Sequence, residues 1–228
     1  MLFDSYLGIV FLLMCAYFIG SLPTASFVVN LVTGSDKRKE GTKIAGAYNV
    51  KRIVGLIPSI CVFSLDLIIK GFLPTFAVSY WISDETILRL TFSLLLVVGH
   101  NWSIFLKFWG GRGIATALGT LLGLHLWQET VILVVLFGLV GKNMIHKDSA
   151  LWAFLGTIWL PGLLLVFQRG LDFVLFGICL VLILFLKRLF ANEKIIDIRY
   201  RDWRIMLSRI VWDRDIMSRE EWLKKSRY

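Results

Sequence analysis

Long apolar runs, separated by short polar or glycine-rich breaks, make up most of the chain. A helix needs about 20 apolar residues to cross a bilayer, so these runs predict membrane-spanning helices. We expect about seven of them, several short enough to require a tilted helix or a thinned bilayer. The predicted ranges are 6–32, interrupted at Ser21-Leu22-Pro23, then 53–82, 86–100, 114–127, 130–142, 149–167 and 170–187. The predicted fold class is an all-α, polytopic membrane protein.

The composition supports this interpretation. Of the 228 residues, 57% are hydrophobic and only 18% are charged, which is little charge for the surface of a soluble domain of this length. The first apolar run is preceded by Asp4 and by no basic residue, so we expect a retained span and not a cleaved signal peptide. The net charge of +9 indicates contact with anionic lipid headgroups, and we expect no nucleic-acid partner.

The basic residues determine the predicted orientation. All 25 Lys and Arg residues except Lys70, Arg89 and Arg169 fall in segments on one side of the predicted spans. Loops rich in Lys and Arg stay on the cytoplasmic side of a membrane. The sequence therefore predicts an N-terminus outside, a cytoplasmic C-terminus, and a multi-pass location in the cell (inner) membrane.

The composition changes near residue 190. We predict a transmembrane domain over residues 1–190 and a basic amphipathic cytoplasmic tail over 191–228. In the tail, apolar residues recur at helical spacing between Arg and Asp residues; they are Trp203, Met206, Leu207, Ile210 and Val211. Such a helix could lie in the membrane interface, or it could pack on the loops as an ordinary soluble helix.

The first inner loop, "GSDKRKEGTKIAGAYNVKR", combines small or turn-forming residues with six cations. Backbone N–H groups of such a loop can converge on an anion while Lys and Arg neutralise it. The alternative is a positively charged inner loop that glycine makes flexible. The candidate anion-binding residues are Gly41, Thr42, Lys43, Gly46, Asn49 and Arg52.

The second inner stretch places three glycines, Gly110, Gly111 and Gly113, just before a helix predicted to start near Ile114. The free N–H groups and positive end of a helix dipole favour a phosphate there. Arg112 can grip phosphate oxygens with a bidentate fork, and Lys107 adds a second charge. His100, at the inner end of the third span, is a candidate base or phosphate ligand, or a structural histidine. We interpret the two loops together as one phosphate site.

Asp66 and Lys70 lie four residues apart inside the second predicted span, on one helix face. Ionisable residues at membrane depth face a polar cavity or each other. A structural pair and a catalytic pair both fit this pattern.

Several chemistries lack their sequence signatures. There is no H-E-x-x-H motif, no Cys/His cluster and no acidic cluster, so we expect neither a metal nor a cofactor. The chain also has no G-x-S-x-G elbow and no Walker loop.

Three passages resemble the bacterial acyl-phosphate:glycerol-3-phosphate acyltransferases. The first is "GSLPTASFVV" followed by "EGTKIAGAYNVKRIVG", the second is "DLIIKGFLP", and the third is "GHNWSIFLKFWGGRGIATALG". Their order and spacing agree with that family over roughly residues 7–190.

The resemblance implies a membrane enzyme that moves a fatty acyl group from acyl phosphate to the 1-hydroxyl of glycerol 3-phosphate, forming lysophosphatidic acid. It implies these two substrates and membrane lipids as partners, and an active face in the cytoplasm. His100 and Thr42 would be catalytic. The residues implied to bind substrate phosphate are Gly41, Lys43, Gly46, Asn49, Arg52, Lys107, Gly110, Gly111, Arg112, Gly113, Ser149 and Arg188.

The sequence also departs from the family pattern. Lys43, Ile44 and Tyr48 stand where the family has Gly, Asn and Thr, and Arg112 replaces a Lys. The last inner segment, "LILFLKRLFANEK", keeps Arg188 but has no counterpart of the family's His and Asn. A lipid-phosphate-binding or transport protein on the same fold, non-catalytic or of altered specificity, is therefore the alternative.

Overall fold

The computed structural model describes residues 5–34, 46–190, 203–215 and 221, and all regular structure in this part of the chain is helical. The predicted all-α class is confirmed. The chain forms two compact units, unit 1 (Met1–Trp127) and unit 2 (Gln128–Tyr228). This division differs from the boundary predicted at residue 190, which stays a prediction.

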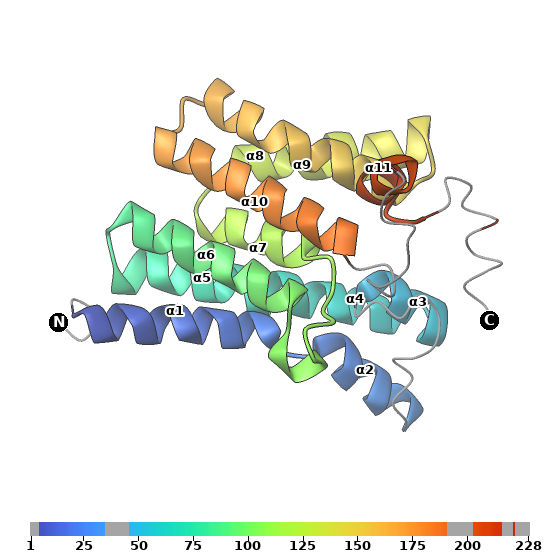
Figure 1. Ribbon diagram of the computed structural model, residues 1–228, viewed down its shortest axis with the longest axis horizontal. Helices are drawn as coiled ribbons and strands as arrows, with labels where there is room; N and C mark the ends of the chain where they lie inside the picture. The colour runs from blue at the N-terminus through green and yellow to red at the C-terminus, as the bar shows by residue number, and fades with distance from the viewer. Residues whose placement is uncertain (1–4, 35–45, 191–202, 216–220, 222–228) are drawn as a thin grey trace. The chain divides into compact units, whose positions relative to one another are not determined.

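Unit 1 contains most of the helices (Figure 1). They are α1 (Tyr6–Ser21), α2 (Thr24–Thr33), α3 (Ala47–Val54), α4 (Leu56–Ser64), η1 (Leu65–Phe72), α5 (Leu73–Ala77), η2 (Val78–Ile82), α6 (Thr86–Asn101), η3 (Ile104–Leu106) and α7 (Ile114–Gly123). From α4 to η2 the helix is continuous over Leu56–Ile82, with π-helical turns at η1 and η2.

The first helix breaks where the sequence predicts it, between α1 and α2. Proline has no amide hydrogen to continue a helical ladder, and Pro23 stands at this break. α1 lies alongside α6, and the two share an apolar core that includes Leu12, Ala16 and Leu96. The Ser103 hydroxyl donates to the Ser21 carbonyl at 2.5 Å, which joins the end of α1 to the loop after α6.

α7 packs directly against the backbone of η1. A Cβ on Gly119 would lie 2.1 Å from the Leu67 carbonyl oxygen, so only glycine permits this approach. The close contact brings the α7 and η1 side chains on this face within reach of each other.

Unit 2 contains α8 (Trp127–Ile132, whose first residue belongs to unit 1), η4 (Leu133–Ile145), α9 (Ser149–Val166), α10 (Leu171–Phe190) and α11 (Trp203–Trp212). α9 and α10 form an antiparallel hairpin, and α11 packs against both (Figure 1). Asp148 caps α9, its carboxylate accepting from the Ala150 amide at 3.0 Å.

Six helices in the described residues are long and apolar enough to cross a membrane. They are Tyr6–Thr33, Leu56–Ile82, Thr86–Leu106, Trp127–Ile145, Ser149–Val166 and Leu171–Phe190. The remaining predicted span, 114–127, contains the ten-residue helix α7, which is about 15 Å long and therefore too short to cross alone. The count of about seven spans and the orientation with the N-terminus outside stay predictions.

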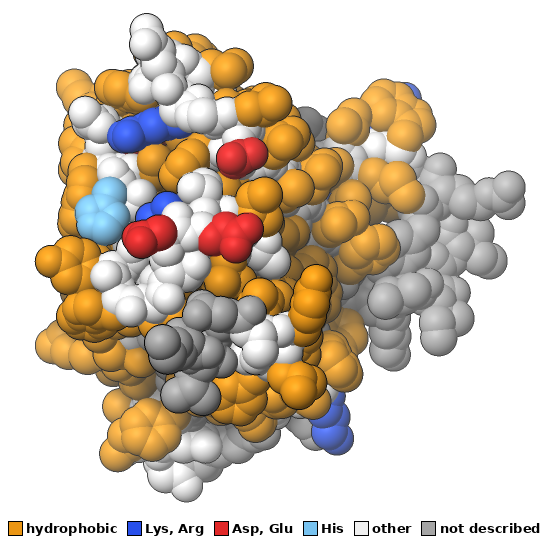
Figure 2. All heavy atoms as spheres, turned by 90° about the vertical axis from the view of Figure 1, so that its left-hand side faces the viewer, with side chains coloured by type: hydrophobic (Ala, Val, Ile, Leu, Met, Phe, Trp, Pro, Cys, Tyr) orange, Lys and Arg blue, Asp and Glu red, His pale blue; other side chains and the backbone are white. Residues whose placement is uncertain are grey.

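Large apolar side chains lie on the surface of these helices. Phe11 is 63% exposed, Trp159 58% and Leu175 51%. In the view of Figure 2, hydrophobic side chains cover much of the surface, and most of the visible charged side chains gather in one region of it. Such exposure on long apolar helices is what a lipid environment requires.

Candidate functional site

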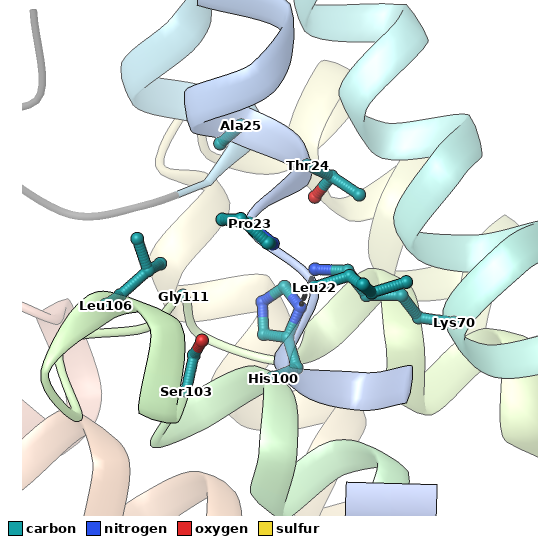
Figure 3. Close-up of a pocket in the computed structure, with 9 residues that line it drawn as sticks. All are labelled: Leu22, Pro23, Thr24, Ala25, Lys70, His100, Ser103, Leu106 and Gly111. Carbon is teal, nitrogen blue, oxygen red and sulfur yellow. Dashed lines mark hydrogen bonds between the residues drawn. The ribbon is translucent and has the colours of Figure 1, made fainter. Parts of the chain in front are cut away.

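A pocket with about 210 Å³ of empty space, including space open to solvent, lies in unit 1 (Figure 3). Four segments build it: the α1–α2 break, η1, the end of α6 with the following turn, and the glycine loop before α7. The lining residues are Leu22, Pro23, Thr24, Ala25, Lys70, His100, Ser103, Leu106 and Gly111.

A buried ion pair forms one wall of this pocket. The Lys70 ammonium lies 2.8 Å from Asp66 Oδ1, and both side chains are 4% exposed. The Thr24 hydroxyl, at the start of α2, donates to the same carboxylate oxygen at 2.6 Å. The predicted i,i+4 pair is confirmed, and it faces a cavity as well as its own partner.

His100 joins the pair to α7. Its Nδ1 lies 3.4 Å from Lys70 Nζ, the contact drawn in Figure 3, and 3.1 Å from the Thr116 hydroxyl. Lys70 donates this contact while it is protonated, so Nδ1 is taken as the acceptor, with the His100 proton on Nε2. The 3.7 Å between His100 Nδ1 and Asp66 Oδ1 is too long for a hydrogen bond, which agrees with this tautomer.

This arrangement bears on the predicted role of His100 as a base. In the tautomer with the proton on Nε2, Nδ1 cannot act as a base while it accepts from Lys70. The base role stays a prediction. The geometry supports donation to an oxygen, while a base role would require the Lys70 contact to rearrange.

The glycine loop folds back onto the end of α6. The Gly110 amide donates to the Asn101 carbonyl at 3.2 Å, and the Gly111 amide donates to the His100 carbonyl at 3.1 Å. A Cβ on Gly110 would lie 2.0 Å from the His100 carbonyl oxygen, so glycine is needed there for close packing. These two amides hold the loop in place, and the predicted phosphate contact of this loop must come from other groups.

The remaining groups of the loop are suited to that contact. α7 begins at Ile114 as predicted, with Gly113 as the preceding residue. The first N–H groups of an α-helix have no acceptor within the helix. Lys107 is exposed and Arg112 is half-buried. The loop therefore combines a helix N-terminus with two cations beside the pocket that Gly111 lines.

The first inner loop is only partly described. Gly41, Thr42 and Lys43 lie outside the described residues. Gly46 precedes α3, where Asn49 is buried and Arg52 half-buried. α3 reaches the pocket wall indirectly, because its Val50 belongs to the same apolar cluster as Ala25, which lines the pocket. The meeting of both loops on one phosphate stays a prediction.

Ser149 and Arg188, also predicted to bind phosphate, belong to unit 2. Ser149 is an exposed residue in the first turn of α9. Arg188 is 4% exposed and donates to three backbone carbonyls: Ile210 at 2.6 Å, Val211 at 3.3 Å and Ala150 at 3.1 Å. Its guanidinium holds helices together, and its phosphate contact stays a prediction.

The sequence interpretation missed three polar residues of this site. Thr24 and Thr116 connect Asp66 and His100 to α2 and α7. Asn101 is fully buried, and its amide N and O have no partner among the described residues. Buried side-chain amides normally form hydrogen bonds, so the two unpartnered atoms of Asn101 are an exception. Two features of the sequence could have identified the threonines. Thr24 is a polar residue directly after the proline that interrupts the first span, and Thr116 is a polar residue in a short apolar helix.

The fold and this site together define a multi-span, all-helical membrane protein with a buried charged cluster beside a basic glycine loop. Residues 10–196 match the family described as glycerol-3-phosphate acyltransferase. The chain belongs to this family, and the resemblance noted in the sequence is confirmed.

Individual relatives agree along most of the chain. It is 34% identical to "Glycerol-3-phosphate acyltransferase 2" of Moorella thermoacetica, covering 72% of this chain and 81% of the relative. It is 31% identical to "Glycerol-3-phosphate acyltransferase 4" of Dehalococcoides mccartyi strain CBDB1, covering 95% and 94%. The crystal structure of PlsY (YgiH), an integral membrane glycerol 3-phosphate acyltransferase in its glycerol 3-phosphate form, superposes with a TM-score of 0.71. That match is 26% identical and covers 79% of this chain and 88% of PlsY.

Proposed function

We propose that the protein transfers a fatty acyl group from an acyl phosphate to the 1-hydroxyl of glycerol 3-phosphate. The hydroxyl oxygen attacks the acyl carbonyl carbon, and the bond from that carbon to the phosphate oxygen breaks. The products are lysophosphatidic acid and inorganic phosphate, and the hydroxyl proton leaves on a phosphate oxygen.

The observation that carries this proposal is the meeting of Lys70, His100 and Gly111 at one pocket in the membrane-spanning unit. Both proposed substrates are phosphate anions. Lys70 in the pocket, with Lys107 and Arg112 of the adjoining loop, would raise their local concentration and screen their mutual repulsion. Membership of the glycerol-3-phosphate acyltransferase family supports the acceptor.

The loop before α7 would hold one phosphate through Arg112, Lys107 and the α7 N-terminus. The first loop, with Thr42, Asn49 and Arg52, would hold the other. A donor aimed at the developing oxyanion contributes about 3–4 kcal/mol, and the Nε2 hydrogen of His100 and the Thr42 hydroxyl are our candidates. In the tautomer in which Nδ1 accepts from Lys70, His100 has no nitrogen left to accept the hydroxyl proton, so we take the substrate phosphate as the proton acceptor.

The acyl chain would extend between the helices into the hydrocarbon core. The basic loops would face the cytoplasm, with the protein in the cell (inner) membrane. This location would bring a water-soluble glycerol phosphate and a lipid-soluble donor to one site.

A donor-exchange assay tests the proposal. Purified protein in liposomes receives labelled glycerol 3-phosphate with palmitoyl phosphate, palmitoyl-CoA or palmitoyl-acyl carrier protein, and labelled lysophosphatidic acid is measured. We expect product with palmitoyl phosphate alone. Product with a thioester alone would keep the acyltransferase and refute the donor.

A second candidate follows from the last inner segment. The His and Asn of the family pattern are missing there, and the Arg188 guanidinium donates hydrogen bonds to backbone carbonyls of the protein. A lipid-phosphate-binding or transport protein would give no product in any arm of the assay but would still bind labelled glycerol 3-phosphate or lysophosphatidic acid.

A further inference from the structure

Arginines fasten α11 to one end of the α9–α10 hairpin. Arg188 of α10 donates to the carbonyls of Ile210 and Val211 at the end of α11. In return, Arg209 of α11 donates to the Leu189 carbonyl at 3.2 Å. Arg214 lies 2.7 Å from the carboxylate of Asp148, the residue that caps α9. α11 is therefore held by hydrogen bonds to the carbonyls at its end, by Arg209 and by the ion pair of Arg214, just after the helix.

These attachments occur at the ends of two membrane spans. The anchoring residues on the hairpin are Asp148, Arg188 and Leu189. The spans run over Ser149–Val166 and Leu171–Phe190, so all three residues lie within two residues of a span end. α11 thus lies at the depth where hydrocarbon gives way to headgroups.

On α11, polar side chains are buried against the protein and large apolar side chains are exposed. Ser208 and Arg209, each 5% exposed, face the protein. Trp203 is 63% exposed, Leu207 49% and Met206 39%, and their spacing puts them on one outward stripe. A surface helix in water shows the opposite pattern, with its apolar stripe buried.

We propose that the outward face of α11 docks on the interfacial layer of the lipid bilayer that holds the spans. Tryptophan is enriched at this depth, and an apolar stripe there removes its surface from water. Arg204, whose guanidinium lies over the Trp203 ring at 5.7 Å from its centre, adds a cation beside the stripe for the phosphate headgroups. The proposal does not depend on the enzymatic reaction.

The other possible occupants fit this face less well. A soluble partner would have to bind an apolar stripe at headgroup depth, where lipid competes for it. A second copy would cover the stripe from both lipid and water. The lipid occupant alone continues the apolar, exposed surface of α9 and α10, which includes Trp159 and Leu182.

Spin-label collision measurements on the full chain in liposomes test the docking. A background with Cys15, Cys61 and Cys179 replaced by Ala carries one new cysteine, Leu207→Cys, with a nitroxide. Two matched positions calibrate depth: Leu182→Cys, 56% exposed on α10, for hydrocarbon, and Lys147→Cys, exposed before α9, for water. Oxygen reports lipid exposure and a soluble nickel chelate reports water exposure.

We expect the oxygen-to-nickel collision ratio at 207 to shift from the value at 147 toward the value at 182. Trp203→Cys, on the same stripe, should behave alike. A ratio at 207 equal to that at 147 would mean that α11 faces water and would overturn the proposal. Low collision with both reagents would mean a protein cover, by a second copy or a partner, and would also overturn it. Circular dichroism of each labelled protein confirms that α11 and the spans are intact.

Discussion

Each compact unit holds a buried acidic group in an ion pair, and the two pairs differ in what surrounds them. In unit 1, Lys70 and Asp66 are both 4% exposed, their contact is a single one, and His100 and a pocket lie beside them. In unit 2, Arg169 grips Glu129 with two bonds, Nε to Oε1 at 2.6 Å and Nη2 to Oε2 at 3.2 Å. Arg169 is 29% exposed and lies in the turn between α9 and α10.

The two pairs differ in whether the cation can still bind another group: Lys70 can, and Arg169 is occupied by its carboxylate partner. A bidentate Arg–carboxylate pair satisfies both partners and fixes geometry. The hydrogen bond that Arg169 donates to the Glu129 carboxylate raises the pKa of Arg169 above its ordinary value, so this guanidinium is a permanent structural cation. Lys70 also contacts His100, and its ammonium has three donors that can be redistributed. We infer that chemistry belongs to the first pair and structure to the second.

The strongest test of the unit 1 pair is Asp66→Ala. It leaves the Lys70 ammonium buried without its carboxylate, and breaking a buried pair in this way costs about 3–5 kcal/mol. We expect that loss in the free energy of unfolding, measured by titration with SDS in mixed micelles. Asp84→Ala, at an exposed site of the same unit, is the control and should change stability by less than about 0.5 kcal/mol. Equal stability of the two variants would show that the pair is not held as described.

Arg112→Ala tests whether the basic loop beside the first pair acts on substrate. Removing one preorganised donor to a transition-state oxyanion lowers kcat by about 10²–10³-fold. We expect a loss of this size in the acyl-transfer assay, with the unfolding midpoint unchanged.

Arg89→Ala is the matched control for Arg112. Arg89 is equally half-buried, but it lies near the other end of α6 and donates to the Asp84 carbonyl and Thr86. It should retain wild-type kcat. A similar loss in both variants would argue against a phosphate role for the loop.

Much of the fold was predictable because bilayer crossing imposes long apolar runs. The ranges of the spans, the break at Pro23 and the start of α7 at Ile114 follow from hydropathy and from proline and glycine positions. The shortness of α7 did not follow, because the apolar run continues through Leu126 while the helix ends at Gly123.

The candidate site was predictable only where its members are close in sequence. The i,i+4 spacing of Asp66 and Lys70 predicted their contact. Thr24 and Thr116 were missed because they reach the cluster across 42 and 16 positions, to Asp66 and His100 respectively. The resemblance of the last inner segment to the family implied Arg188 as a phosphate ligand, and this role stays a prediction. The competing acceptors, the carbonyls at the end of α11, exist only in the folded chain.

Gly119→Ala probes whether the cluster needs the close approach of α7 to η1. Its new Cβ would meet the Leu67 carbonyl at 2.1 Å, and overpacking of this kind costs about 1–3 kcal/mol. The shift would also move Thr116 from His100, so we expect lower kcat as well as lower stability. Gly162→Ala, in α9 of unit 2 with open space around its Cβ, is the control and should be neutral or stabilising by up to about 1 kcal/mol. An active, stable Gly119→Ala variant would uncouple the helix contact from the site.

Arg169→Gln is the closest test of the comparison and should have the smallest effect on kcat. Glu129 is fully buried, so the variant leaves its carboxylate without a charged partner; because Arg169 is 29% exposed and Gln can still donate, we expect the free energy of unfolding to fall by about 1–3 kcal/mol. The backbone hydrogen bonds of the turn remain, among them the Arg169 amide to the Leu164 carbonyl at 2.9 Å, so the α9–α10 hairpin should still form. The kcat, measured under conditions where the protein stays folded, should equal that of the wild type. Neither Arg169 nor Glu129 is among the residues that line the pocket of Figure 3. If Arg169→Gln instead lowered kcat as far as Arg112→Ala while stability stayed the same, the assignment of chemistry to one pair and structure to the other would be wrong.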